Sequence, residues 1–177
     1  MQIKLTINDA VRTVTIAPGE LLLETLRRLG LMSVKMGCGE GDCGACAVLV
    51  NGRPRSACLI YAASVEGSKV TTVEGLGTPT NPHALQQAFV DAGATQCGYC
   101  NPGSVIAAKA LLDRNPAPTA AQVQEALDGN LCRCTGYVKR IDAVLRAAKS
   151  LAKARVQSGT ETDAASPGNP SAKKSKR

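Results

Sequence analysis

Residues 37–46 read Gly-Cys-Gly-Glu-Gly-Asp-Cys-Gly-Ala-Cys, and this loop decides how the N-terminal half of the chain folds. It carries three cysteines in a C-x4-C-x2-C spacing, with four glycines between and beside them. A loop that turns three thiols toward one point needs tight turns with positive φ, which glycine adopts without a Cβ clash. A fourth cysteine, Cys58, follows the loop and can complete the set from a neighbouring strand.

This first cysteine set, Cys38, Cys43, Cys46 and Cys58, has the spacing of the plant-type ferredoxins and predicts a [2Fe-2S] cluster. Backbone N–H groups that the Gly-rich loop leaves free can donate to the sulfurs and help to set the reduction potential. A zinc site is the alternative. Zinc sites usually take their cysteines from separate C-x2-C or C-x4-C pairs, however, whereas three of these thiols share one loop.

A second cysteine set consists of Cys97, Cys100, Cys132 and Cys134. Its C-x2-C half could be a thioredoxin-like redox pair, but that motif accompanies a βαβ pattern, and here a helix opens at Pro102. The other half precedes a helix whose first N–H groups can face an anionic centre. The spacing by itself leaves both a second [2Fe-2S] cluster and a zinc site open.

The segments around the first set predict a sheet that holds one helix. Apolar residues alternate along 3–7 and 14–16, with a turn at Asn8-Asp9 between them, which indicates a hairpin. A leucine-rich helical stripe over 22–29 ends at Gly30. Asn51-Gly52 predicts a second hairpin, and 70–73 reads as the last strand. We assign residues 1–75 to this domain.

Residues 76–82 have the composition of a linker, and the period beyond them becomes helical. We expect a helical domain over 83–155 made of four helices with short connections. The predicted helices run from an Asn81 cap with Pro82 at the first helical position to Gly93, from Pro102 to Asn115, from a Thr119–Gln122 capping box to Gly129, and along the apolar stripe 141–151. Residues 156–177 are polar and basic, and we predict a disordered tail there.

Composition excludes several classes of protein. The 177 residues are 44% hydrophobic, enough for a buried core, but no apolar run approaches the roughly 18 residues of a membrane span. The start has no signal-peptide pattern, so we expect a cytoplasmic location, with export alongside a signal-bearing partner as the alternative. Eight cysteines in a reducing compartment favour metal or cluster ligation over disulfides.

The formal charge of +7 does not indicate a nucleic-acid partner, because most of the excess lies in residues 151–177 and only four aromatic residues are present to stack bases. Catalytic candidates are also poor. The one histidine, His83, is expected to face solvent at a helix start. Glu40 and Asp42 lie in the cysteine loop, where they can shape it or face an electron partner. We predict no catalytic residue, and interpret the chain as an electron carrier.

Three motifs, at 37–46, 96–103 and 129–137, occur in an order that resembles the small iron–sulfur subunits of the molybdenum hydroxylases, the family of xanthine dehydrogenase, aldehyde oxidoreductase and carbon monoxide dehydrogenase. The resemblance covers residues 1 to about 155. It implies an α+β architecture, with an N-terminal β-grasp, ferredoxin-like domain and a four-helix domain that binds a second [2Fe-2S] cluster. The ligands implied for that cluster are Cys97, Cys100, Cys132 and Cys134.

The same resemblance implies a large partner subunit that binds molybdopterin, with Gln96 and Cys134 of this chain near the pterin. It implies an electron acceptor beside the first cluster, either a medium subunit that binds FAD or a cytochrome, and an aldehyde, an N-heterocycle or a related small molecule as substrate. One departure is Asn101, where the family usually has Thr or Ser. We expect Asn101 to cap the helix that starts at Pro102.

Two other functions fit parts of the sequence. The small subunit of a 4-hydroxybenzoyl-CoA reductase would use the same scaffold with electrons running the opposite way. A zinc-stabilised interaction module with a basic tail belongs to another class. Iron and labile sulfide in the purified protein, or zinc in their place, would distinguish the cluster and zinc interpretations.

Overall fold

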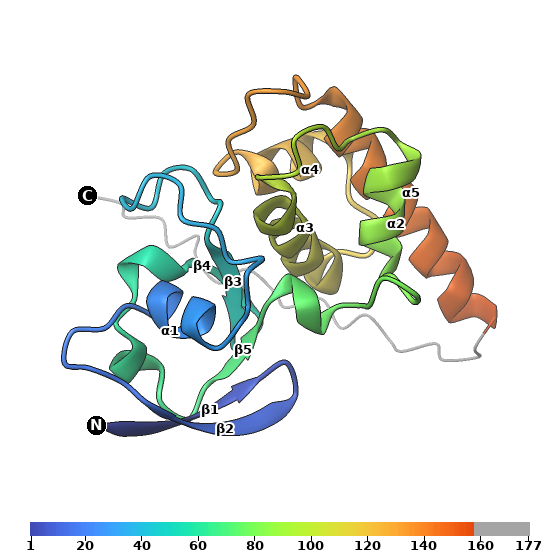
Figure 1. Ribbon diagram of the computed structural model, residues 1–177. Coiled ribbons are helices and arrows are strands. Elements are labelled where there is room, and N and C mark those ends of the chain that lie inside the picture. The colour runs from blue at the N-terminus through green and yellow to red at the C-terminus, as the bar shows by residue number, and fades with distance from the viewer. Residues whose placement is uncertain (158–177) are drawn as a thin grey trace, which may run out of the picture.

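The computed structural model describes residues 1–157, in which a mixed sheet with one helix is followed by four further helices (Figure 1). The sheet has the strand order β2-β1-β5-β3-β4. Its strands are β1 (Gln2–Ile7), β2 (Ala10–Thr15), β3 (Ala47–Val50), β4 (Arg53–Ser56) and β5 (Lys69–Thr71). Helix α1 (Leu22–Arg28) lies against the sheet, and short 3-10 turns follow β4 and β5 (Figure 1).

Both predicted hairpins are confirmed. Asn8 and Asp9 have φ values of 48° and 66°, and the register pairs Ile7 with Ala10 across the two-residue turn. Asn51 and Gly52, with φ values of 49° and 76°, join β3 to β4 in the same way. Two successive residues with positive φ match the right-handed twist of the strands that they connect.

The last strand is shorter than predicted. It ends at Thr71 because the backbone N–H of Thr72 donates to Asn8 Oδ1 at 2.9 Å, which turns the chain out of the sheet before Val73. A 3-10 turn, Val73–Gly75, follows at once. The side chain of Asn8 therefore decides where the strand ends, through a contact between residues 64 positions apart.

The core of the sheet unit contains the alternating apolar residues that the sequence marks out. Ile3, Leu5 and Ile7 are each 1% exposed and pack with Leu22 and Leu26 of α1. Burying a side chain of this size contributes about 1.5–3 kcal/mol. Cys46 and Cys58 belong to the same buried cluster, so half of the first set is anchored in the core.

The four helices of the second unit are α2 (Ala84–Asp91), α3 (Asn101–Arg114), α4 (Ala120–Leu127) and α5 (Val138–Gln157). Of these four helices, α3 lies next to the sheet, between it and the other helices (Figure 1). Its Ile106 and Ala110 form a small buried cluster with Leu49 of β3. The two units thus share an apolar contact. Among residues 1–157, none of the helices combines the length and apolar character needed to cross a bilayer.

The capping box of α4 is confirmed, but the predicted start of α2 is wrong. In α4 the Thr119 hydroxyl accepts from the Gln122 N–H at 3.3 Å, and Gln122 Oε1 accepts from the Thr119 N–H at 2.8 Å. In α2 the cap is His83, whose Nδ1 accepts from the Leu85 N–H at 3.2 Å. Asn81 instead pairs through its backbone with Thr78 in a tight turn.

This arrangement also corrects the expectation that His83 faces solvent, since its side chain is partly buried at the start of α2. Helix α4 ends at Leu127, two residues before Gly129. Helix α5 continues to Gln157, beyond the expected boundary at 155. The rest of the predicted tail, 158–177, lies outside the described residues.

Candidate iron–sulfur sites

The structure brings the four thiols of the first set together. Cys38, Cys43 and Cys46 lie on the loop between α1 and β3, and Cys58 lies in the 3-10 turn that follows β4. The Cys38 N–H donates to Cys43 Sγ at 3.4 Å, while the thiols of Cys46 and Cys58 are in hydrogen-bonding contact. Cys43 also lies near enough to Cys46 to contribute to the raised pKa of that thiol, so the two pairs are neighbours.

The environments of these thiols differ. The Glu40 N–H donates to Cys38 Sγ at 3.4 Å and, together with contacts from Cys43, lowers the pKa of Cys38 to about 6. Burial raises the pKa of Cys46 to about 11, and the neighbouring Cys58 and Cys43 add to the effect. Four adjacent thiolates repel one another, so they can ionise together only around a cation.

The second set is brought together from two loops of the helical unit. Cys97 and Cys100 precede α3, whereas Cys132 and Cys134 lie between α4 and α5. The sulfurs of Cys134 and Cys97 are 3.6 Å apart, and the thiols of Cys100 and Cys132 are in hydrogen-bonding contact. These are again two pairs.

Nearby hydrogen-bond donors and burial also change the pKa values of the thiols in the second set. Although burial alone would raise it, the pKa of Cys132 falls to about 7, because the hydroxyl and N–H of Thr135 bond to its sulfur. The Tyr99 N–H lowers the pKa of Cys97. Burial raises the pKa of Cys100. The site therefore provides N–H and O–H groups aimed at anionic sulfur.

Paired thiols fit a two-iron cluster, in which each iron takes two of the four protein ligands. A structural zinc ion instead needs four ligands around one centre. The two-by-two arrangement of both sets favours [2Fe-2S] clusters over the zinc alternative.

Arg140 lies beside the second set, and the sequence analysis did not identify it. Its side chain is 0% exposed, and its Nη2 donates to Cys100 Sγ at 2.5 Å. A signal for it does exist, because Arg140 lies three, four and seven positions before Ala143, Val144 and Ala147, the buried face of α5. An arginine on an apolar stripe predicts a buried cation.

The expected cap at Asn101 is wrong. Asn101 lies inside α3, and Cys100 occupies the cap position without a side-chain bond. Asn101 Nδ2 donates instead to Thr95 Oγ1 at 2.7 Å, and its Oδ1 accepts from Arg140 at 3.4 Å. The amide therefore braces the loop that carries Cys97, which a capping side chain would not do.

A short junction connects the two sets. The Leu131 N–H donates to the carbonyl oxygen of Cys43 at 3.0 Å, and Asn130 Nδ2 donates to the carbonyl oxygen of Gly44 at 3.1 Å. The Tyr99 hydroxyl also donates to the carbonyl oxygen of Met36. Residues next to the thiols of one set thus contact residues next to the thiols of the other.

Two of the thiols lie at the surface of the helical unit. Cys97 and Cys134 are exposed, and Gln96, which precedes Cys97, is exposed too. Cys100 and Cys132 are more buried. In the first set, Cys38 is exposed beside the exposed Glu40. Each set therefore has one side open to a partner.

Comparison with known proteins agrees with this geometry. A family model described as "2Fe-2S iron-sulfur cluster binding domain" matches residues 5–69, and one described as "[2Fe-2S] binding domain" matches residues 72–145. The small FeS subunit of nicotinate dehydrogenase from Eubacterium barkeri is 49% identical over 145 residues, which cover 81% of this chain and 92% of that protein.

Solved structures show the same fold. Quinoline 2-oxidoreductase from Pseudomonas putida 86 matches with a TM-score of 0.83 and 40% identity, over 86% of this chain and 96% of that chain. Aldehyde oxidoreductase from Desulfovibrio desulfuricans ATCC 27774 matches with a TM-score of 0.84 and 45% identity, over 86% of this chain but only 17% of that chain. With two consecutive [2Fe-2S] domains and these relatives, the chain belongs to the small iron–sulfur subunits of the molybdenum hydroxylases, the electron-transfer components that work beside a large molybdenum-binding partner.

Proposed function

We propose that the chain carries electrons from a molybdenum site that oxidises an aromatic N-heterocycle, first through a cluster on the second set and then through one on the first set. The ligands are Cys97, Cys100, Cys132 and Cys134, followed by Cys38, Cys43, Cys46 and Cys58. The final acceptor is a flavin subunit or a cytochrome. The observation that carries the proposal is the hydrogen bond from Leu131 to Cys43, which links the two sets directly.

The surroundings of the thiols support this role. A bound [2Fe-2S] cluster takes up one electron and gives it up again without breaking a covalent bond of the chain. Loop N–H groups from Glu40 and Thr135 donate to the ligand sulfurs and stabilise their negative charge. Burial of Cys46 and Cys58, at 3% and 5% exposed, keeps water away from one side of the first set.

The direction of transfer follows from what each set leaves exposed. Gln96, Cys97 and Cys134 offer a surface to the large subunit, and we propose that Gln96 and Cys134 lie beside its pterin. Cys132 follows directly after Leu131, the junction residue, so it lies toward the first set. Cys38 and Glu40 offer the second open surface, which suits the acceptor.

The names of the relatives support an N-heterocycle as substrate, since one is a nicotinate dehydrogenase subunit and another a quinoline 2-oxidoreductase chain. An aldehyde is the competing substrate class, because aldehyde oxidoreductase shares the fold at 45% identity. The substrate binds on the large subunit, so the support for its class comes only from the proteins to which this chain is related.

The test uses the complex purified with its large subunit. Two [2Fe-2S] EPR signals are expected on reduction, and Cys132→Ser is expected to remove one of them and to stop turnover. Ser64→Ala, at an exposed position whose hydroxyl donates to the carbonyl oxygen of Tyr61, is the control. Nicotinate should reduce the clusters anaerobically, whereas benzaldehyde should not. Zinc in place of iron, two intact signals in Cys132→Ser, or net flow toward molybdenum would each refute the proposal.

A further inference from the structure

Arg140 is the largest of the fully buried side chains in the described part of the chain. It lies in the first turn of α5, on the face that packs against the rest of the bundle with Ala143, Val144 and Ala147. Arginine is almost never fully buried unless an anion accompanies it. Its position therefore requires a partner.

The side-chain hydrogen bonds of Arg140 run to Cys100 of the second set and to two residues of α3 that follow it. Nη2 donates to Cys100 Sγ at 2.5 Å and more distantly to Asn101 Oδ1 at 3.4 Å. Nη1 donates to the Ser104 hydroxyl at 2.9 Å. Nε has no hydrogen-bond partner within residues 1–157. The guanidinium is thus held by α3 and directed at a thiol.

No carboxylate of residues 1–157 forms an ion pair with Arg140. Leaving a buried cation without a counter-charge is strongly destabilising. Among the groups that it contacts, only the Cys100 sulfur can become an anion. The local charge is balanced when Cys100 is a thiolate, which is also the form that binds iron.

We propose that Arg140 raises the reduction potential of the cluster on the second set through its charged hydrogen bond to Cys100, and so makes that cluster the better acceptor for electrons arriving from molybdenum. The inference rests on the proposed function, which assigns a cluster to these four thiols. Arg140 is a positioning residue, because it acts on the cluster through Cys100.

The sign follows from the charge change. An oxidised cluster with four thiolates carries about −2, and one-electron reduction of one iron from ferric to ferrous adds one negative charge. A cation in the protein interior stabilises the more negative state, because the low dielectric there strengthens the attraction. Hydrogen bonds to ligand sulfurs are among the terms that set iron–sulfur potentials.

Three substitutions in the complex with the large subunit separate charge from hydrogen bonding. Arg140→Lys keeps the charge, Arg140→Gln keeps a donor, and Arg140→Met keeps neither. EPR-monitored redox titration gives the potential of each cluster. The cluster on the first set is the internal reference, and Lys139→Ala is the matched control because it removes a neighbouring exposed charge.

Arg140→Met is expected to shift the ratio of oxidised to reduced second cluster at least tenfold toward oxidised at a fixed ambient potential, which is about 59 mV for a one-electron couple. The potential of the second cluster in Arg140→Gln is expected to lie between those of Arg140→Met and wild type. In Arg140→Lys it is expected to be close to that of wild type. The reduction potential of the first cluster should stay unchanged in all three variants, and Lys139→Ala should change neither potential. Where Arg140→Met does not assemble, a lower potential in Arg140→Gln than in Arg140→Lys is still required.

Unchanged potentials in the neutral variants would overturn the role of Arg140, as would loss of the cluster in Arg140→Lys, which would indicate a purely structural residue. A wild-type complex with only one [2Fe-2S] signal would instead refute the proposed site. The two failures are therefore distinguishable.

Discussion

The backbone N–H of Leu131 donates to the carbonyl oxygen of Cys43 at 3.0 Å, and this bond joins the segments that carry the two cysteine sets. Cys43 carries a thiol of the first set, and Leu131 precedes Cys132 of the second. Asn130 strengthens the junction through Gly44. Because electron transfer slows steeply with distance, contacts that keep this junction closed bear directly on function.

Gly44→Ala should open the junction. Gly44 has φ +66°, and a Cβ there would lie 2.3 Å from both the Gly129 carbonyl oxygen and Asn130 Nδ2. We expect a loss of about 2–3 kcal/mol in the free energy of unfolding, from strain and displaced contacts, and slower reduction of the first cluster by substrate. Urea unfolding and rapid-freeze EPR measure the two effects.

The control for this change is Gly67→Ala, which has φ +73° but nothing within 4 Å of the new Cβ. It imposes the backbone strain without the clash, so it should cost about 1 kcal/mol and leave the rate of cluster reduction unchanged. Equal effects of the two substitutions would contradict the importance of the junction.

Asn130→Ala tests the side-chain half of the junction. Asn130 is 5% exposed, and its Nδ2 bonds to the Gly44 carbonyl oxygen at 3.1 Å. Its removal leaves a buried carbonyl without this donor, which should cost about 1–3 kcal/mol. Asn115→Ala, which removes exposed bonds to Gln122 and to the Ala117 N–H, should lower the free energy of unfolding by less. The denaturant midpoints of the two variants measure this difference. A larger loss of stability in Asn115→Ala than in Asn130→Ala would contradict the stabilising role of the junction.

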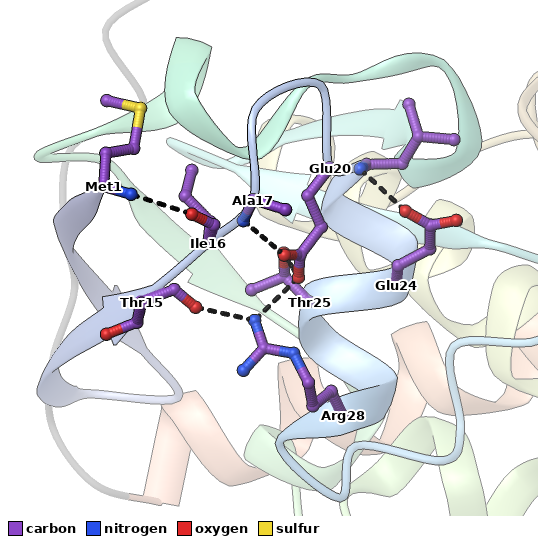
Figure 2. A network of polar contacts seen from close by, with 9 residues as sticks. Met1, Thr15, Ile16, Ala17, Glu20, Glu24, Thr25 and Arg28 are labelled. Carbon is purple, nitrogen blue, oxygen red and sulfur yellow. Dashed lines mark hydrogen bonds and ion pairs between the residues drawn. The ribbon is translucent and has the colours of Figure 1, made fainter.

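Glu20→Gln should destabilise the sheet unit at neutral pH. The Glu20 carboxylate accepts from the Ala17 N–H at 2.9 Å, the Thr25 hydroxyl at 2.8 Å and Arg28 at 2.7 Å (Figure 2). The bond from Arg28, with those from Ala17 and Thr25, lowers the pKa of Glu20 from 4.5 to about 2.

A carboxyl with a lowered folded-state pKa stabilises the fold above its unfolded pKa, and the contribution is lost as the pH falls toward the folded value. The free energy of unfolding of wild type should therefore exceed that of Glu20→Gln by about 1 kcal/mol at pH 7. This difference should vanish as the pH falls from about 5 to 2. Glu66→Gln, at an exposed position, is the control. A difference that persists at pH 2 would argue against this account.

His83 should make α2 sensitive to mild acid. Burial, followed by the nearby charge of Lys109, lowers the pKa of His83, and its Nδ1 can accept from Leu85 only when unprotonated. The unfolded chain binds the proton more readily, so stability should decline as the pH falls below 6.5 toward the folded-state value. Thermal unfolding at pH 8 and pH 5 measures the decline.

His83→Asn is expected to keep the cap and lose the pH dependence, because asparagine is among the best capping residues and does not titrate in this range. His83→Ala should cost about 1 kcal/mol at pH 8. The same pH dependence in His83→Asn as in wild type would locate the effect elsewhere.

Local chemistry explains which elements could be predicted. Asn8-Asp9 and Asn51-Gly52 impose their turns through residues that tolerate positive φ, and the Thr119 capping box involves residues three positions apart. The start of α2 and the end of β5 could not be predicted in this way. Asn81 is engaged by Thr78 in a turn of its own, and Thr72 is held by Asn8 of the turn between β1 and β2, 64 positions away.

The sequence by itself determined the two sets of four thiols, the Gly-rich loop that presents three of them, and the order of the two domains, because spacing and turn chemistry are properties of neighbouring residues. Only the tertiary structure decided how the thiols pair, that Leu131 meets Cys43, and that Arg140 reaches Cys100 from 40 residues away. These contacts form when α5 packs on α2 and α4 and the helical unit packs on the sheet. Burial then selects partners for groups that would otherwise be solvated.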